Sequence, residues 1–191
     1  MESKAVVAGR RLARLEAHLR SSLPREDSSV VGTNATAGAA KREIDLSELR
    51  GMVGKELGVS SWHQVAQDRI NAFAECTEDR QWIHVDVERA KKESPFKGPV
   101  AHGFLTLSLG PVLAGEANPK IKGAKMAVNY GLNKVRFISP VPAGSNVRLR
   151  TTLQEITDVP GGVQTVTLWT FEREGHDKPA CVAESIGRFY F

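Results

Sequence analysis

The stretch "AHGFLTLSLGPVLAGEA", residues 101–117, decides how the rest of the chain must fold. Its side chains are almost wholly apolar on every helical face as far as Ala114. Because a helix of this kind is stable only where other elements cover all of its sides, it belongs in the middle of a fold. We therefore expect a long central helix here. Pro111 is expected to kink or end it, because proline removes a helical hydrogen bond.

The chain that follows this helix has the pattern of β-strands. Turns rich in proline and glycine separate four such segments, at residues 125–138, 145–157, 163–174 and 180–191. In the second segment Val147 and Leu149 alternate with Arg148 and Arg150, as a sheet with two unlike faces requires. The pattern predicts an α+β fold in which four or five antiparallel strands wrap around one buried helix.

Shorter elements are expected ahead of the central helix. The leucines at positions 46, 49 and 57 have helical spacing, and Asp86 is a suitable N-cap for a later helix. The predicted elements are a helix over residues 46–57, a short strand over 61–65, a helix over 66–79 and a brief helix over 86–93.

The first 27 residues carry a separate amphipathic pattern. Its apolar side chains recur at helical spacing opposite a face of arginines, at Leu12, Leu15, Leu19 and Leu23. We expect an N-terminal helix over residues 1–27 that docks on the main domain or on a partner subunit; an organelle-targeting segment and a membrane-surface anchor are the alternatives. Residues 28–44 are rich in small and polar side chains and predict a linker, so the main domain covers residues 45–191.

The composition excludes several classes of protein. The 191 residues are 41% hydrophobic, enough for a substantial core, and the formal net charge is only +4, with the cations spread along the chain. We therefore expect no nucleic-acid partner. No apolar run is long enough to span a bilayer and no secretory signal is visible, so a cytoplasmic protein is expected. Cys76 and Cys181 lack the spacing of a metal or redox pair, and we expect two buried free thiols.

The segment "TEDRQWIHVD", residues 77–86, places Asp79 and His84 five positions apart, beside a tryptophan and an isoleucine. Together with the sequence Ala101-His102-Gly103 it resembles the MaoC-like dehydratase family, whose hot-dog fold curls a sheet around one long central helix. The family signature runs Gly-Asp-x-Asn-Pro, an aliphatic residue and His, and an alanine-His-Gly turn follows later. The resemblance extends over roughly residues 45–191. It implies an R-specific enoyl-CoA hydratase.

Three positions depart from this signature. Glu78 stands in place of the glycine, Gln81 in place of the asparagine and Trp82 in place of the proline. Gln81 keeps an amide that can orient a catalytic group through hydrogen bonds, and Trp82 makes a bulkier pocket wall. Both residues are expected to support the substrate pocket, and the change at Trp82 leaves the acyl length open.

The chemistry that the resemblance implies explains why these residue types are useful. Hydration of a 2-enoyl thioester places a hydroxyl on C3 and a proton on C2, while negative charge develops on the thioester oxygen. Asp79 and His84 are expected to hold one water, accept its proton and deliver a proton to C2, and each such transfer is typically worth about 10² to 10⁴ in rate. The backbone N–H of Gly103, at the start of the central helix, is expected to receive the developing oxyanion.

The expected reaction uses neither a metal ion nor a redox cofactor, because the substrate itself carries CoA or the phosphopantetheine of an acyl-carrier protein. The partners expected by resemblance are the acyl-CoA substrate and a second copy of the chain, with the acyl tunnel close to the interface of a homodimer. Lys134 and Arg136 are treated as ordinary strand cations rather than as phosphate contacts.

Two other functions remain open for this sequence. A hot-dog thioesterase would hydrolyse an acyl thioester with a carboxylate, but thioesterases of this fold generally lack the paired Asp and His. A non-catalytic acyl-thioester-binding subunit would have lost these residues, and Asp79 and His84 are present. The remaining histidines are expected to be structural or solvated, at His18, His63, His102 and His176.

Overall fold

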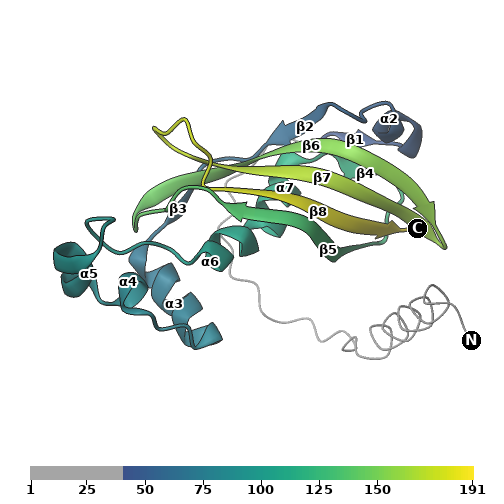
Figure 1. The fold of residues 1–191 in the computed structure, drawn as a ribbon. Coiled ribbons are helices and arrows are strands. Elements are labelled where there is room, and N and C mark those ends of the chain that lie inside the picture. Colours follow the sequence, from purple (N-terminus) through teal and green to yellow (C-terminus); the bar gives the residue numbers. More distant parts are fainter. Residues whose placement is uncertain (1–40) are drawn as a thin grey trace, which may run out of the picture. The chain divides into compact units, whose positions relative to one another are not determined.

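The structure is a computed structural model that describes residues 41–191 (Figure 1). The helices are α2 (Leu46–Arg50), α3 (Gln67–Thr77), α4 (Trp82–Val85), α5 (Val87–Glu93), α6 (Gly103–Ser108) and α7 (Gly110–Ala117). The strands are β1 (Glu43–Ile44), β2 (Glu56–Val59), β3 (His63–Val65), β4 (Lys120–Ile121), β5 (Met126–Phe137), β6 (Ser145–Val159), β7 (Gly162–Arg173) and β8 (Cys181–Tyr190). The predicted N-terminal helix over residues 1–27, and residues 28–40 of the predicted linker, lie outside the described residues.

One antiparallel sheet forms the body of the domain. Its strand order is β2-β6-β7-β8-β5, and β3 pairs with β6 beyond β2. Figure 1 shows the long strands curving around α6 and α7. The predicted α+β architecture, an antiparallel sheet wrapped around a central helix, is therefore confirmed.

The alternation of side chains on β6 is also confirmed. Val147, Leu149 and Leu153 are fully buried, while Arg148 and Arg150 turn to the opposite face. On that outer face both arginines bind Glu172 of β7, each with an Nε–carboxylate distance of 2.6 Å. The inner face of β7 carries Val163, Thr165, Thr167, Trp169 and Phe171.

The central helix is broken in the middle. α6 ends at Ser108 and α7 begins at Gly110, with Leu109 as the junction and Pro111 in the first turn of α7. The expected kink is therefore present, at Leu109, two residues before Pro111. Pro111 does not end the helix, because proline is tolerated in the first turn of α7. The expected burial on all sides is wrong: Phe104 is 67% exposed and Val112 is 55% exposed. One face of the helix is left uncovered in the described chain.

Two expectations for residues 43–58 need correction. The predicted helix over residues 46–57 ends at Arg50, because Gly51 caps it and Gly54 turns the chain in the left-handed region at φ 81°. The following residues form β2, which pairs with β6. The last two residues of the predicted linker form β1, which runs parallel to β4 and buries Ile44.

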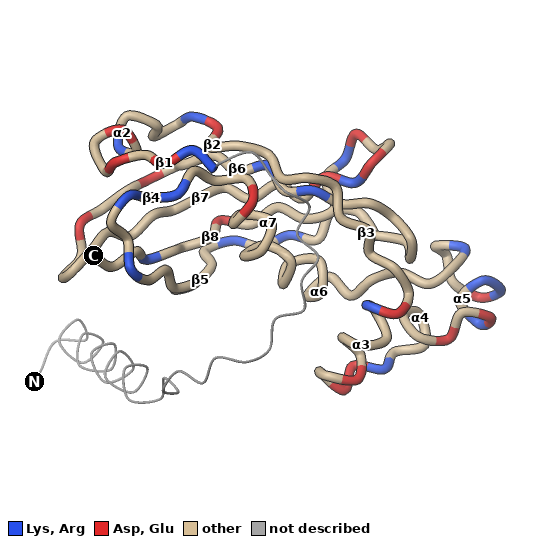
Figure 2. The backbone as a smooth tube through the Cα atoms, turned by 180° about the vertical axis from the view of Figure 1, so that it is seen from behind, with Lys and Arg blue, Asp and Glu red and all other residues tan. Residues whose placement is uncertain are grey.

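The cysteines and charges are distributed as follows. Cys181 is buried, and this burial raises the pKa of its thiol to about 11, but Cys76 on α3 is exposed, so the expectation of two buried thiols is half wrong. Figure 2 shows basic and acidic residues interspersed along the described chain. No helix within residues 41–191 is long and apolar enough to cross a bilayer.

We predict that two glycines of α7 respond in opposite ways to alanine. A Cβ atom at Gly110 would collide with the ring of Trp169, so Gly110→Ala should lower the free energy of unfolding by about 1–3 kcal/mol or more. Gly115 has nothing within 4 Å of such an atom, so Gly115→Ala should raise it by about 0.5–1 kcal/mol. Urea denaturation measures both. Equal effects of the two substitutions would refute the packing of Trp169 on the helix.

Candidate active site

The loop between α3 and α4 carries Asp79. Helix α3 ends at Thr77, and Glu78 follows with a left-handed φ of 63°. This is the position of the signature glycine, and only glycine adopts such a φ at no cost, so Glu78 holds a strained conformation at the edge of the site. Arg80 then ties the loop back to the helix with two hydrogen bonds to Glu75, of 2.9 and 2.8 Å.

His84 lies on α4 and is almost completely buried, with 6% of its surface exposed. Its Nδ1 lies 2.6 Å from the carbonyl oxygen of Val100, in the segment that leads to α6. Because a carbonyl can only accept, Nδ1 carries the proton and the neutral ring keeps its lone pair on Nε2. The amide Nε2 of Gln67 donates to the carbonyl oxygen of His84 at 2.7 Å and holds the backbone of this residue in place.

The environment of His84 keeps the ring neutral. Burial lowers the pKa of its imidazole below the usual range, and the neighbouring His102 lowers it further. The hydrogen bond to Val100 and the charge of Asp79 act in the opposite direction, but they do not outweigh burial. A neutral imidazole with a free Nε2 can accept a proton at physiological pH.

His102 packs directly against His84. The two rings stack with centroids 3.7 Å apart and an interplanar angle of 28°, and only 3% of His102 is exposed. The Nε2–H of His102 donates to the backbone carbonyl oxygen of Asp79 at 2.9 Å. His102 was expected to be structural or solvated. The structure shows in addition that it links the Asp79 loop to the start of α6 and packs against His84. Its position next to Gly103 was the available signal.

Asp79, His84 and His102 form one compact cluster, in which a carboxylate oxygen and two ring nitrogens lie within 4.8 Å of one another. Asp79 and His84 make no direct hydrogen bond in the described chain, and a separation of this size suits a bridging water. The number of donors would suit a metal ion. However, the stacked rings direct their in-plane lone pairs along nearly parallel planes, and these do not converge on one ion as a metal site requires.

Gly103 is the first residue of α6, directly after His102. Its backbone N–H is therefore a helix-start donor without an intrahelical acceptor, one residue from the ring that stacks on His84. The glycine has a second reason to be there, because a Cβ atom would lie 2.9 Å from the ring of Phe137. Phe137 of β5 thus packs against the helix start, and Phe104 meets it edge-on at a centroid distance of 5.6 Å.

Gln81 and Trp82 are the two residues expected to support the pocket. Gln81 is exposed, and its contribution to the site is the carbonyl oxygen that accepts the His84 N–H at 2.9 Å. The amide that contacts the His84 backbone belongs instead to Gln67, which sequence reasoning missed. Trp82 is half-buried under the guanidinium of Arg89, 4.4 Å from its ring centroid, so its indole packs against α5.

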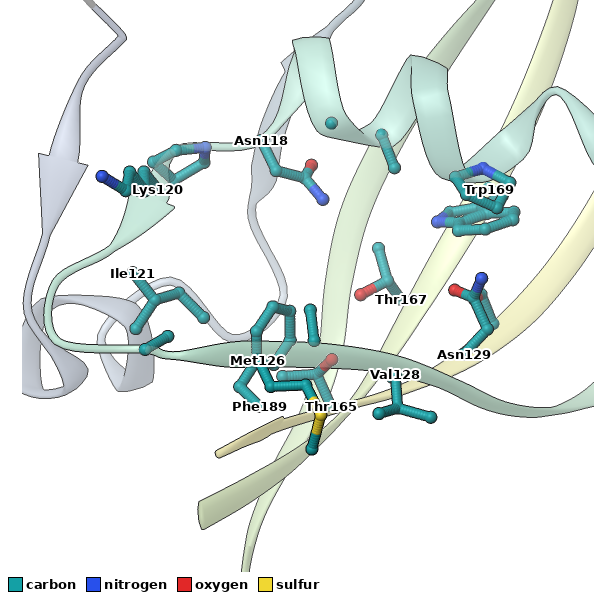
Figure 3. A pocket seen from close by; sticks show the side chains of 18 of the residues that line it. Asn118, Lys120, Ile121, Met126, Val128, Asn129, Thr165, Thr167, Trp169 and Phe189 are labelled. Atoms are coloured by element: carbon teal, nitrogen blue, oxygen red, sulfur yellow. The ribbon is translucent and has the colours of Figure 1, made fainter. Parts of the chain in front are cut away.

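Three cavities follow the central helix away from this cluster. The first is lined by Gly103 and Thr106 of α6, and the second by Leu107 and Ser108. The third lies under α7 and has a volume of about 480 Å³ (Figure 3). The second and third adjoin, since they share Pro111, Asn129, Trp169 and Ser185. The second and third cavities therefore form one elongated space along the helix.

Comparisons with known proteins show the family of this chain. The family model described as "MaoC like domain" matches residues 48–172. The chain is 48% identical over 145 residues to the 3-hydroxyacyl-thioester dehydratase Z of Mycobacterium tuberculosis, with 75% of this chain and 95% of that protein covered.

Two solved structures are similar in fold. One is a MaoC-like dehydratase from Rhodospirillum rubrum, with a TM-score of 0.62, 21% identity and coverage of 76% of this chain and 95% of that one. The other is an (R)-hydratase from A. caviae involved in PHA biosynthesis, with a TM-score of 0.58, 23% identity and coverage of 71% and 94%. The expected hot-dog fold is confirmed.

We predict that the hydrogen bond from His102 holds the Asp79 loop. His102→Phe keeps a ring on His84 but removes the N–H donor, so amide hydrogens of residues 77–81 should exchange faster, by about 2- to 10-fold, the equivalent of one lost hydrogen bond. His102→Gln keeps a donor and should show a smaller change, and His176→Phe in an exposed loop serves as the control. Unchanged exchange in His102→Phe would show that the loop is held by other contacts.

Proposed function

Since the chain belongs to the MaoC-like dehydratase family, whose members are hydro-lyases of acyl thioesters, we propose that it interconverts trans-2-enoyl-CoA and R-3-hydroxyacyl-CoA. The observation that carries this proposal is the cluster of a carboxylate and a buried neutral imidazole, whose polar atoms lie within 4.8 Å of one another. General acid–base addition of water needs this combination, because a proton must leave the water while another reaches the substrate.

The proposed hydration proceeds at the Asp79–His84 pair. A water held between the carboxylate and His84 Nε2 attacks C3 of the enoyl thioester and forms the new C–O bond. The pair takes up the proton of this water, the electrons of the double bond move toward the thioester carbonyl, and a proton is returned to C2. The reverse sequence removes water. The neutral state of His84 supports the role, since a charged imidazole has no lone pair to accept the proton.

The proposed oxyanion donor is the backbone N–H of Gly103. Negative charge that develops on the thioester oxygen needs a donor that is already oriented, and loss of one such donor costs about 3–4 kcal/mol in other enzymes. Gly103 supports this role by its position at the start of α6, next to His102, whose ring stacks on His84. The packing of Phe137 on its Cα holds the helix start in place.

We further propose that the substrate carries CoA or an acyl-carrier protein, that no metal or redox cofactor takes part, and that two copies of the chain associate. The apolar side chains that the described chain leaves exposed on the helix and on the edge strand support association, at Phe104, Val112, Leu132, Phe137 and Ile138. Strand β5 lies at the edge of the sheet, where a second chain can pair with it. A homodimer would cover both features.

The thioesterase and the non-catalytic subunit are less well supported. A thioesterase needs a carboxylate beside the scissile bond but gives no reason for a buried imidazole held neutral next to it. A non-catalytic subunit gives no reason for the hydrogen bonds that orient both His84 and the Asp79 loop. Crotonyl-CoA separates the three functions: a hydratase removes the absorbance of the conjugated thioester, a thioesterase releases free thiol, and a binding subunit does neither.

We predict that Asp79 and His84 act as one unit. Asp79→Asn and His84→Gln should each lower turnover of crotonyl-CoA by at least about 100-fold, because either change removes a proton-transfer group. The double variant should lose much less than the product of the two effects.

The matched control is Asp86→Asn, a neighbouring carboxylate that caps α5 and can be replaced by asparagine with little effect. Near-normal turnover in either folded single variant would remove that residue from the mechanism. Strict multiplication of the two losses would show that the residues act independently.

A further inference from the structure

The cavity under α7 has an unusual floor. Its inner surface is formed by β7 and β8, where Thr165, Thr167 and Ser185 line the space of about 480 Å³ together with Trp169 (Figure 3). Thr165 pairs with Gly187 and Thr167 pairs with Ser185 across the two strands, so the three hydroxyl-bearing residues are neighbours on one face of the sheet. A space that only receives a hydrocarbon chain gains nothing from hydroxyl groups.

These hydroxyls have no hydrogen-bond partner among the side chains and backbone groups of residues 41–191, although the three residues are only 5%, 7% and 6% exposed. Thr151 of β6 provides the internal comparison. Its hydroxyl is buried in the packed core and is satisfied, with Asn118 Oδ1 at 2.6 Å and the Gly58 carbonyl oxygen at 3.2 Å. Among the described residues these three hydroxyl oxygens of the cavity are not fully enclosed by protein atoms, so they are open to the cavity and available to hydrogen-bond a ligand that enters it.

On the inward face of β7, the residues that carry hydroxyl groups are those that line the cavity. Along the inward face of β7, Val163 and Phe171 at the two ends are apolar and buried, while the two threonines lie only where the strand passes under the space. Gly187 leaves room beside Thr165, since even a Cβ atom there would lie 3.5 Å from Thr165 Oγ1. Figure 3 shows Thr165, Thr167 and Trp169 following one another along the strand.

The cavity lies along the same broken helix that begins at Gly103, so an acyl chain bound at Gly103 that follows the helix leads toward it. It begins where the second cavity ends, and Ala114 on its roof lies about three helical turns beyond Gly103. A four-carbon acyl group bound at Gly103 is too short to extend this far. A longer acyl chain that follows the helix would bring its distal carbons over Thr167 and Thr165.

We propose that this cavity binds the distal part of the acyl chain and selects chains that carry an oxygen function there, a hydroxyl or a carbonyl group. The proposal rests on the proposed hydratase function and adds the class of substrate to it. Hydroxyl groups can donate and accept, so Thr165, Thr167 and Ser185 suit either oxygen function. A site that hydrogen-bonds a substrate oxygen discriminates against the analogue that lacks it, because its own polar groups are then left unpaired.

The test compares pairs of trans-2-enoyl-CoA substrates of equal length, with decenoyl, dodecenoyl and tetradecenoyl chains, each with a methyl end or with an ω-hydroxyl. We expect kcat/KM to favour the hydroxylated partner for at least one length by about 3- to 10-fold, the equivalent of one net hydrogen bond. Thr165→Val, Thr167→Val and Ser185→Ala should reduce this preference, and at least one of them should abolish it. Turnover of crotonyl-CoA should stay unchanged in all three variants.

The control variant is Thr170→Val, which alters the opposite face of the same strand and should leave the preference intact. A wild-type preference for the methyl end at every length would overturn the proposal, as would a preference that all three cavity variants retain. Failure of the wild type to hydrate crotonyl-CoA would contradict the hydratase function instead. In that case calorimetric titration with the saturated acyl-CoA pairs, with or without the ω-hydroxyl, tests the cavity by the same comparison.

Discussion

The hydrogen bond from His84 Nδ1 to the Val100 carbonyl is the interaction on which the site depends. At 2.6 Å it is short, it is buried, and it assigns the proton of the neutral ring to one nitrogen. It also ties α4 to the segment that enters the central helix, two elements that are separate in sequence. If this bond were absent, the ring could rotate, its proton would no longer be fixed on Nδ1, and α4 would lose a hydrogen bond to the segment that leads into α6.

His102 makes a second connection in the opposite direction, since it leaves the start of α6 and reaches the carbonyl oxygen of Asp79. Between them, the two histidines join the loop and the helix start through one backbone carbonyl each and through their stacked faces. The sheet then fixes where this unit lies, because Trp169 packs on Gly110 and Phe137 packs on Gly103. Both contacts need a glycine, so the helix touches the sheet closely at its start and at its break.

Much of the fold could be predicted from the sequence, because periodicity reports burial directly. The alternation on β6 and the proline in the broken helix are local signals, and the structure follows them. The short strand β2 could not be found in this way, since its residues also fit a helix and only pairing with β6 decides between the two. The exposure of Phe104 and Val112 was missed for a related reason: an apolar side chain that the described chain leaves exposed has the same pattern in the sequence as a buried one.

The site was predictable only where a motif marked it. Asp79, His84 and Gly103 stand at recognisable spacing and lie in one region of the structure. The Ala101-His102-Gly103 motif marked His102, but not its hydrogen bond to the Asp79 backbone. Gln67 also acts through a contact with the backbone of a distant residue, and no spacing in the sequence encodes such a contact. Trp82 has its indole against Arg89 because the first turn of α4 directs it toward α5, which the identity of the residue does not reveal.

The most direct measurement of this account is a nitrogen NMR titration of the protein labelled at its histidines. It reports, for each ring, which nitrogen carries the proton and at what pH the ring becomes charged. The account predicts that His84 is neutral near physiological pH, protonated on Nδ1 and bare on Nε2, with a pKa below the usual value of about 6.5. A His84 ring that is charged at neutral pH, or that carries its proton on Nε2, would contradict it.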